Sequence, residues 1–255
     1  MSVPDSTLLE YDICMESAER RVFHLLHSLE WQLISDKKNG RVWKMRCNVT
    51  ENYMFRYEGI IPNRTPTEVA VIVHPEGAHR ALWDTQSAGT PLIARIRDDT
   101  SIIRHDTKSR LMGIISQREA VDLCRFATDS ETGCKNFVKI FLTMDSPLEF
   151  SLIEKNDPLS GTRSVVMVSV SHPSAPLREG IVRVHTHPSL LLIAPSGSDT
   201  KVTSIIQAEM HLMGIPPSVV DNFLPKGIIN FFDDLRAYTA KDLKLDLNEP
   251  LTGWI

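Results

Sequence analysis

Apolar residues recur at helical spacing near both ends of the chain. From about Thr7 to Trp31 they fall at every third or fourth position, and Asp5 or Ser6 can cap the start of a helix there. A second and more strongly apolar face lies between Pro216 and Tyr238. Its apolar positions are Val220, Phe223, Leu224, Phe231 and Leu235. We predict a long helix at each end of the chain, the second with a kink or a break at Pro225.

Between these helices the pattern changes to the alternation of apolar and polar residues that is typical of strands. The alternation runs from about residue 41 to 61, stops over two short helical stretches before Trp83, and returns between residues 91 and 210. Thr65, with Glu68 three residues later, predicts the cap of the first short helix. The alternating segments after residue 91 are PLIARIR, SIIRHD, AVDLCRF, FVKIFLTM, EFSLIE, RSVVMVSVS, GIVRVHTH, SLLLIAP and KVTSIIQAEM. Strands that follow one another without intervening helices predict an antiparallel meander.

The pattern therefore predicts an α+β fold, in which the antiparallel sheet can be arranged to curl around the long C-terminal helix. Such a sheet leaves a concave interior, which is the usual place for a small-molecule site. No internal repeat and no low-complexity linker divides the sequence. We expect one domain over residues 1–240 and a short, weakly ordered tail over residues 241–255.

Composition and charge narrow the possible functions. The 255 residues are 42% hydrophobic and 24% charged, with a formal net charge of −4. This charge offers no electrostatic reason to expect a nucleic acid or a strongly anionic membrane as partner. The four cysteines, Cys14, Cys47, Cys124 and Cys134, show no CxxC spacing, which favours free thiols in a cytoplasmic protein. The first residues do not resemble a signal peptide, and no run of about 18 apolar residues could span a bilayer.

The stretch VRVHTHPSLLLIAPSGSD, residues 182–199, allows two interpretations. The JAMM zinc peptidase motif runs H-x-H, seven residues, then S-x-x-D. Here His185 and His187 are followed by Ser196 and Asp199, but eight residues separate His187 from Ser196. Two histidines on one strand face, about 6.6 Å apart, could share a zinc ion. Alternatively, the stretch is a strand, a bend at Pro188, a second strand and a turn.

Six segments, in their order and spacing, resemble a START domain, the StAR-related lipid transfer fold, over about residues 30–238. They are WQLISDKKNGRVWKM (31–45), YEGIIP (57–62), WDTQ with IRDDTSIIRHD (83–106), GIISQREAVDL (113–123), EGIVRVHTHP (179–188) and DTKVTSIIQAEMHLMGIPPSVVDNFLP (199–225). The most similar part of the family is the small subgroup associated with sterols and bile acids. The resemblance implies a helix-grip fold, in which a curved nine-stranded antiparallel sheet wraps around the C-terminal helix and encloses one lipid.

The resemblance also implies which residues would contact the lipid. Several family members hold an acidic residue and an arginine inside the cavity, and those two positions carry His105 and Cys124 here. We expect His105 to offer a hydrogen bond to the lipid and Cys124 a small apolar contact. The other expected lipid-binding residues are Gln207, Val220, Phe223 and Leu224. The expected lid is the loop 172–180, with Leu177 and Gly180, together with Val219 on the last helix.

Two segments depart from the family pattern. The motif Pro-Arg-Asp-Phe becomes Gln117-Arg118-Glu119-Ala120. We expect Arg118 to form a structural ion pair, since an unpaired buried guanidinium is costly. The segment 128–160 is longer than the family implies, so we expect an extra hairpin or an extended loop there. Trp83 and Asp84 are expected to be architectural, as a buried indole and a turn carboxylate.

The function expected from these residues and the resemblance is lipid carriage without a reaction. The protein would hold one sterol or similar lipid, contact membranes transiently, act as a monomer in the cytoplasm, and need no cofactor, metal or catalytic residue. Two alternatives stay open. One is a lipid-sensing regulatory module that acts through a protein partner, which the segment 128–160 would favour. The other is a JAMM-like zinc peptidase.

Overall fold

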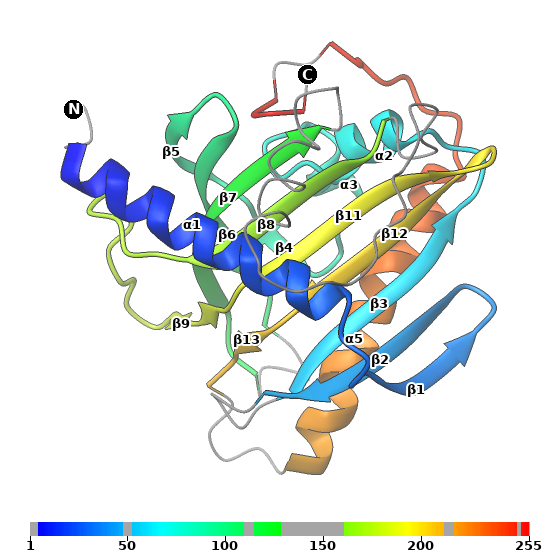
Figure 1. Ribbon diagram of the computed structural model, residues 1–255, viewed down its shortest axis with the longest axis horizontal. Coiled ribbons are helices and arrows are strands. Elements are labelled where there is room, and N and C mark those ends of the chain that lie inside the picture. Colours follow the sequence, from blue (N-terminus) through cyan, green and yellow to red (C-terminus); the bar gives the residue numbers. More distant parts are fainter. Residues whose placement is uncertain are drawn as a thin grey trace, which may run out of the picture.

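The computed structural model places one large curved sheet between two long helices (Figure 1). The structure describes residues 5–47, 53–109, 115–128, 161–211, 217–248 and 251–254. The predicted strands FVKIFLTM and EFSLIE, and the predicted hairpin or loop of the long segment, lie outside the described residues.

The main sheet has eleven strands in the described part of the chain, in the order β1-β2-β3-β12-β11-β8-β7-β6-β4, with β5 on β6 and β9 on β7. The strands of this sheet are β1 Gln32–Lys37, β2 Gly40–Arg46, β3 Tyr53–Ile61, β4 Ser87–Gly89, β5 Leu92–Arg97, β6 Thr100–Thr107, β7 Arg118–Thr128, β8 Arg163–Ser169, β9 Val182–Arg183, β11 Ser189–Ser196 and β12 Asp199–Ile206. Every pairing is antiparallel except that of β7 with β9. From β5 onward, the long strands β5, β6, β7, β8, β11 and β12 pair in chain order, as the predicted antiparallel meander requires. The described sheet has two strands more than the nine that the resemblance implied.

A separate two-stranded ladder joins β10 (His185–Thr186) to β13 (Ala208–Glu209). In the chain, β10 follows directly after β9, and β13 follows directly after β12. The stretch 182–199 therefore consists of two short strands, a bend at Pro188, the long strand β11 and a turn that leads into β12. The strand-and-turn interpretation of this stretch is correct.

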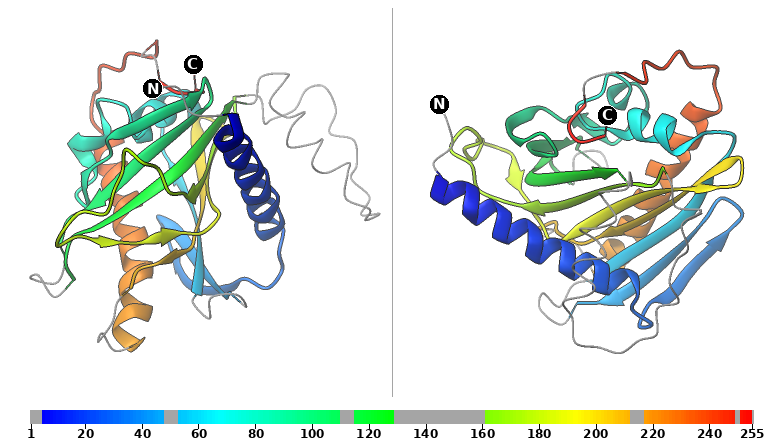
Figure 2. Two further views of the ribbon diagram at one scale, coloured as in Figure 1. Left: turned by 90° about the vertical axis from the view of Figure 1, so that its left-hand side faces the viewer. Right: turned by 45° about the horizontal axis from the view of Figure 1, so that its top comes forward.

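The helix α1 (Asp5–Leu26) covers the outer face of the sheet (Figures 1 and 2). Its buried side chains recur every three or four residues, as predicted: Tyr11, Met15, Ala18, Val22 and Leu25. They pack on outward-facing strand residues such as Ile102, Leu123 and Leu190, and we call this set the outer cluster. The helix ends before the predicted Trp31. The Trp31 indole donates to the carbonyl of Leu25 and caps the last turn, while Leu29 is 99% exposed.

Two short helices, α2 (Pro66–Val73) and α3 (Arg80–Trp83), close one end of the concave inner face. The predicted cap of α2 is confirmed. Thr65 Oγ1 accepts a hydrogen bond from the amide of Glu68, and the Glu68 carboxylate accepts one from the amide of Thr65. This reciprocal pair satisfies two amides that the first helical turn leaves without partners.

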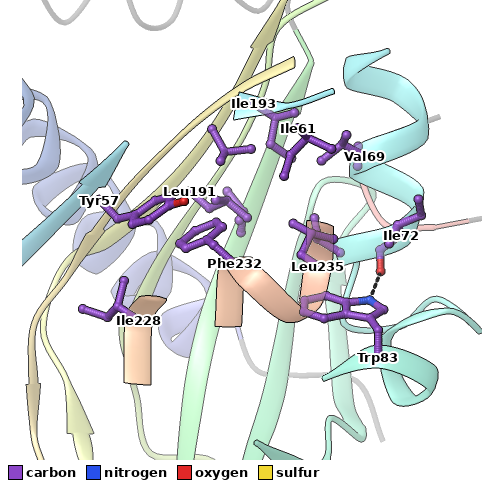
Figure 3. Close-up of a cluster of buried hydrophobic side chains, with 14 of the residues drawn as sticks. Tyr57, Ile61, Val69, Ile72, Trp83, Leu191, Ile193, Ile228, Phe232 and Leu235 are labelled. Carbon is purple, nitrogen blue, oxygen red and sulfur yellow. Dashed lines mark hydrogen bonds between the residues drawn. The ribbon is translucent and has the colours of Figure 1, made fainter. Parts of the chain in front are cut away.

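The long helix α5 (Pro217–Thr239) lies on the inner face, opposite α1 (Figure 2). Ile228, Phe232 and Leu235 are buried between α5 and the sheet, and the ring of Phe232 stacks on Tyr57 at 4.0 Å (Figure 3). We call the buried side chains of this face the inner cluster, which includes Ile61, Val69, Ile72, Trp83, Leu191 and Ile193. Burial of each large apolar side chain contributes about 1.5–3 kcal/mol.

Of the predicted kink or break at Pro225, the break does not occur, because α5 continues through this residue. The kink stays a prediction. Proline lacks one amide donor and clashes with the preceding turn, at a cost of about 3 kcal/mol. The apolar contacts that α5 makes after Pro225, with Ile228, Phe232 and Leu235 in the inner cluster, outweigh that cost.

The prediction of a weakly ordered tail is wrong for residues 251–254. Leu251, Thr252 and Trp254 are buried, and the Trp254 indole donates to the carbonyl of Ser164 at 3.0 Å. A tail of this length can be held in place by one large side chain, and Trp254 supplies it. The boundary between a domain at 1–240 and a tail at 241–255 stays a prediction.

Candidate functional site

Alternation along the strands sorts their side chains between the two faces of the sheet. On β7, Val121 and Leu123 belong to the outer cluster under α1, whereas Cys124 and Phe126 belong to the inner cluster under α5. Asp122 therefore lies on the inner face, two residues before Cys124. On β6, Ile103 packs in the inner cluster and places His105 on the same face.

His105, Asp122 and Cys124 meet on this inner face. His105 Nε2 lies 3.9 Å from Asp122 Oδ2 and 4.0 Å from Cys124 Sγ. The two strands bring them together because β6 and β7 are paired in register, with His105 opposite Ala120. The predicted neighbours His105 and Cys124 are thus close together, and the structure adds Asp122 to them.

Burial sets the ionisation of all three groups. It lowers the pKa of His105 to about 4, with nearby Arg80 acting in the same direction, so the imidazole is neutral at pH 7. Burial raises the pKa of Asp122 to about 6, although hydrogen bonds from Ser169 and Thr186 oppose that rise. Burial also raises the pKa of the Cys124 thiol well above its ordinary value, so this cysteine is not an activated nucleophile.

Asp122 also links the inner face to the segment that contains β10. Its Oδ1 accepts a hydrogen bond from Ser169 Oγ at 2.7 Å, and its Oδ2 accepts one from Thr186 Oγ1 at 3.2 Å. Ser169 Oγ in turn accepts the amide of Thr186. Strand alternation could have identified Asp122 from the sequence, because it lies two residues from Cys124, which was already expected to face inward.

A second polar pair on the inner face was not expected from the sequence. Arg80 and Asp84 form an ion pair at 2.8 Å, with side-chain exposures of 16% and 4%. The Arg80 guanidinium also lies over the rings of Trp83 and Phe231, at 5.1 and 4.9 Å. Trp83 and Asp84 have the architectural roles that were predicted. The indole donates to the Ile72 carbonyl (Figure 3), and Asp84 accepts amide hydrogen bonds in the following turn.

The remaining expected lipid contacts are only partly described. Leu224 packs against the inner cluster, and Gln207 is 4% exposed, with its backbone N–H donating to Ser189 Oγ. Val220 and Phe223 fall within α5, but their side chains lie outside the described residues. The assignment of these four residues to lipid binding stays a prediction.

The loop 172–180, expected to be a lid, lies beside the first turns of α1 and away from α5 in Figure 1. Ala175 is buried in the outer cluster, and Arg178 forms ion pairs with Glu119 and Asp106. Leu177 is 76% exposed, and Gly180 has a positive φ of 72°. Val219, the third lid residue, lies in α5, and its side chain is outside the described residues.

The predicted ion pair of Arg118 is not found among the described residues. Its guanidinium donates to the backbone carbonyls of Ser116 and Met210 and forms no ion pair with a described residue. The neighbouring Glu119 forms the ion pairs instead, with Arg178 and Arg183 on the outer face. Alternation explains the difference, since successive residues of β7 point to opposite faces of the sheet.

The zinc ligand set of the peptidase hypothesis is not assembled. The rings of His185 and His187 are 4.8 Å apart, and His187 Nε2 lies 2.7 Å from Glu209 Oε1. Asp199 lies beyond β11, at the opposite end of a strand about 25 Å long, where it accepts the amide of Asn63. No three His, Cys, Asp or Glu side chains gather as metal ligands in the described ranges.

Among the helices of the described chain, none combines the length and apolar character needed to cross a membrane. The long helices α1 and α5 each present polar residues along one side and apolar residues along the other, as expected for helices that pack on a sheet.

Comparison with known proteins connects this architecture to a family. The START domain model matches residues 156–242. StAR-related lipid transfer protein 5 of Bos taurus is 28% identical over 228 residues, which cover 88% of this chain and 92% of that protein. StAR-related lipid transfer protein 6 of Homo sapiens is 22% identical, over 89% of this chain and 91% of that protein.

The fold agrees with these sequence matches. The solved structure of human StAR-related lipid transfer protein 5 superimposes with a TM-score of 0.73 and 22% identity, covering 92% of this chain and 98% of that one. A StAR-related protein of Xanthomonas axonopodis superimposes with a TM-score of 0.57 and 17% identity, over 83% and 99% of the two chains. The predicted helix-grip fold is confirmed by these structures, and residues 156–242 of this chain are similar to the START domain model.

Proposed function

We propose that this protein carries one neutral, hydroxyl-bearing lipid, such as a sterol, between the curved sheet and α5, and moves it between membranes through the cytosol. The matched relatives are named as lipid transfer proteins, which supports lipid binding and transfer as the general activity. The class of lipid is argued from this chain's own residues.

The inner face supplies apolar surface for a lipid body. Besides its buried residues, it carries apolar side chains that are only partly buried. These are Tyr53, Met167, Ile206, Leu224, Ile229 and Phe231. Met167 is paired directly with Cys124 across β7 and β8, beside the polar group described above. Transfer of a lipid's apolar surface from water to such a face is favourable by about 25 cal/mol per Å².

The single observation that carries the lipid class is the spacing of His105 and Asp122. The 3.9 Å between His105 Nε2 and Asp122 Oδ2 is too long for a direct hydrogen bond. One hydroxyl oxygen can lie within hydrogen-bonding distance of both atoms, about 2.8 Å from each. It would donate to the Asp122 carboxylate and accept from the neutral imidazole of His105.

The same pair disfavours anionic lipids. At pH 7 the Asp122 carboxyl is mostly ionised, because its pKa of about 6 lies below that pH. A fatty acid or bile acid carboxylate beside it would place two like charges in a buried site, which is costly. The Arg80 guanidinium does not offset this repulsion, since Asp84 already neutralises it.

Exchange with a membrane would require part of the domain to move. We assign this step to the loop 172–180, with the exposed Leu177 and with Gly180, and to the start of α5 at Val219, together with Val220 and Phe223. Transient contact with the bilayer by a monomer is sufficient, because no covalent step occurs.

The proposal is tested by native mass spectrometry of the purified protein with the lipid that it retains from cells. We expect one neutral lipid with a free hydroxyl per chain. Binding of a sterol and of its methyl ether is then compared in the wild type, in His105→Leu and in Thr107→Val, a control two residues along the same strand. The wild type and the control should prefer the free sterol about tenfold, and His105→Leu should lose that preference. Equal binding of sterol and ether by the wild type would refute the proposed role of the pair.

A further inference from the structure

A small pocket lies at the end of β8, next to β9 and β10. Its volume is about 260 Å³. Val121 and Val170 form part of an apolar wall, and Ser171, Arg183, His185 and His211 supply polar groups. Val121 belongs to the outer cluster under α1, whereas Ser169, which also lines the pocket, donates a hydrogen bond to Asp122 on the inner face.

The polar groups of this pocket are hydrogen-bond donors. Within the described parts of the chain, the side chains of Ser171, His185 and His211 form no hydrogen bond with other residues, and no carboxylate lines the pocket. His185 and His211 are exposed at its rim. Each imidazole can donate at least one N–H, and the Ser171 hydroxyl can donate another.

A network of arginine and carboxylate side chains lies behind this rim. Arg183 donates from Nε and Nη2 to Glu119, at 2.9 and 2.6 Å. Glu119 is shared with Arg178 and lies 3.9 Å from Arg104, and both of these arginines also pair with Asp106. The Asp122 carboxylate also interacts electrostatically with Arg183, which itself lines the pocket. Glu209 binds His187 and interacts electrostatically with both rim histidines, but it does not line the pocket.

We propose that this pocket binds a phosphate group that is carried by a small organic alcohol, as in glycerol 3-phosphate or in the headgroup of phosphatidate. Three donors, the guanidinium of Arg183 in the lining and the absence of a lining carboxylate favour an anion with several acceptor oxygens. The volume limits the ligand to a phosphate with a few carbon atoms, since drug-sized ligands occupy about 300 Å³ or more. The ligand is thus a soluble phosphate ester or a membrane headgroup, and both present the same chemistry to the pocket.

The variant that tests the pocket removes both rim histidines, His185→Ala together with His211→Ala. Both side chains are exposed, so the substitution leaves the core intact. Arg183 is left in place, because it also holds Glu119. His24→Ala, an exposed histidine on α1, is the matched control. Loading of the lipid in the inner site should be unchanged in all of these proteins, which separates this test from that of the lipid site.

Binding of glycerol 3-phosphate and of inorganic phosphate is followed by isothermal titration and amide NMR shifts. Sedimentation with phosphatidylcholine vesicles, with and without phosphatidate, tests whether the protein binds the headgroup in a membrane. Binding of the soluble ester by the wild type and the control, weakened about tenfold or more in the double variant, supports a soluble ligand. Binding only to phosphatidate vesicles, lost in the double variant, supports the headgroup. If neither source binds, or if the double variant binds as the wild type does, the proposal is wrong.

Discussion

The backbone carbonyl of Thr252 lies 3.2 Å from Nε2 of His74, and the two residues are 178 positions apart in the chain. His74 Nδ1 accepts the amide of Glu76, so the ring proton is on Nε2, which donates to Thr252. The ring also stacks on Phe126 at 4.4 Å and meets the edge of Trp254 at 5.2 Å. The C-terminal residues are therefore attached to the core through a neutral histidine.

Replacement of Trp254 by alanine should destabilise the fold substantially. The indole is 4% exposed, contacts Phe126 and His74, and donates to the Ser164 carbonyl. Truncation of a buried tryptophan costs about 3–5 kcal/mol. Urea unfolding of Trp254→Ala should show this loss in the free energy of unfolding. Leu247→Ala, at a 43% exposed position in the same tail, is the control and should change it little. Wild-type stability in Trp254→Ala would show that the tail does not contribute to the core.

Acid should destabilise the protein through its buried histidines. Burial lowers the pKa of both His74 and His105 from the ordinary 6.5 to about 4. Between these values the unfolded chain binds protons that the folded chain does not, so the free energy of unfolding falls as the pH decreases from 6.5 towards 4. Urea unfolding over this range should show the decline, and it should be shallower in His74→Gln than in the wild type. A decline of the same slope in that variant would contradict the role of His74.

Protonation of Asp122 should have the opposite effect on the free energy of unfolding over part of the same pH range. Burial raises its pKa from 3.8 to about 6, so the folded chain binds the proton more tightly than the unfolded chain. Its contribution to stability is greatest below pH 3.8 and is lost as the pH rises through 6. Asp122→Asn should therefore show a steeper loss of stability than the wild type when the pH falls from 6 to 4. Identical pH profiles of the two proteins would rule out the proposed ionisation of Asp122.

Removal of the Asp84 charge from the Arg80–Asp84 pair should lower the free energy of unfolding substantially. Asp84→Asn keeps an Oδ1 acceptor for the amides of Gln86 and Ser87, but it leaves the buried Arg80 guanidinium without a counter-charge. Such a loss costs about 3–5 kcal/mol. Asp36→Asn breaks the Arg41–Asp36 pair, in which both side chains are more than half exposed, and should cost at most about 1 kcal/mol. The difference between the two variants in thermal or urea unfolding measures the effect of burial.

The fold could be predicted from local patterns, but the polar groups of the inner face could be predicted only in part. Strand alternation located the long strands, and the spacing of Thr65 and Glu68 located a helix cap. The same alternation places Asp122 beside Cys124, so that residue could have been found. The ion pair of Arg80 and Asp84 has helical spacing, but only the packing of α3 against α5 shows that it is buried. The attachment of Trp254 depends on Ser164, a contact across 90 residues that no local pattern contains.

Glu119 should control the attachment of the loop 172–180 to the sheet. Its side chain is fully buried and forms ion pairs with Arg178 and Arg183, and Arg183 also donates to the carbonyls of Ala175 and Pro176. Burial raises the pKa of Glu119, but the two arginines outweigh this effect and hold it below its ordinary value. Glu119→Gln removes the negative charge that Arg178 and Arg183 share. The resulting destabilisation should be about 3 kcal/mol or more.

Hydrogen exchange can detect this change locally. The amides of Val182 and Val184 donate to the carbonyls of Gln117 and Glu119 on β7, so their protection reports on the attachment. We expect these amides to exchange at least about tenfold faster in Glu119→Gln, because a smaller free energy then suffices for local opening. Glu58→Gln, which breaks a half-buried pair with Arg56 and Lys201 on a distant strand, is the control. If both variants protect Val182 and Val184 as the wild type does, the loop is held by its backbone contacts and not by Glu119.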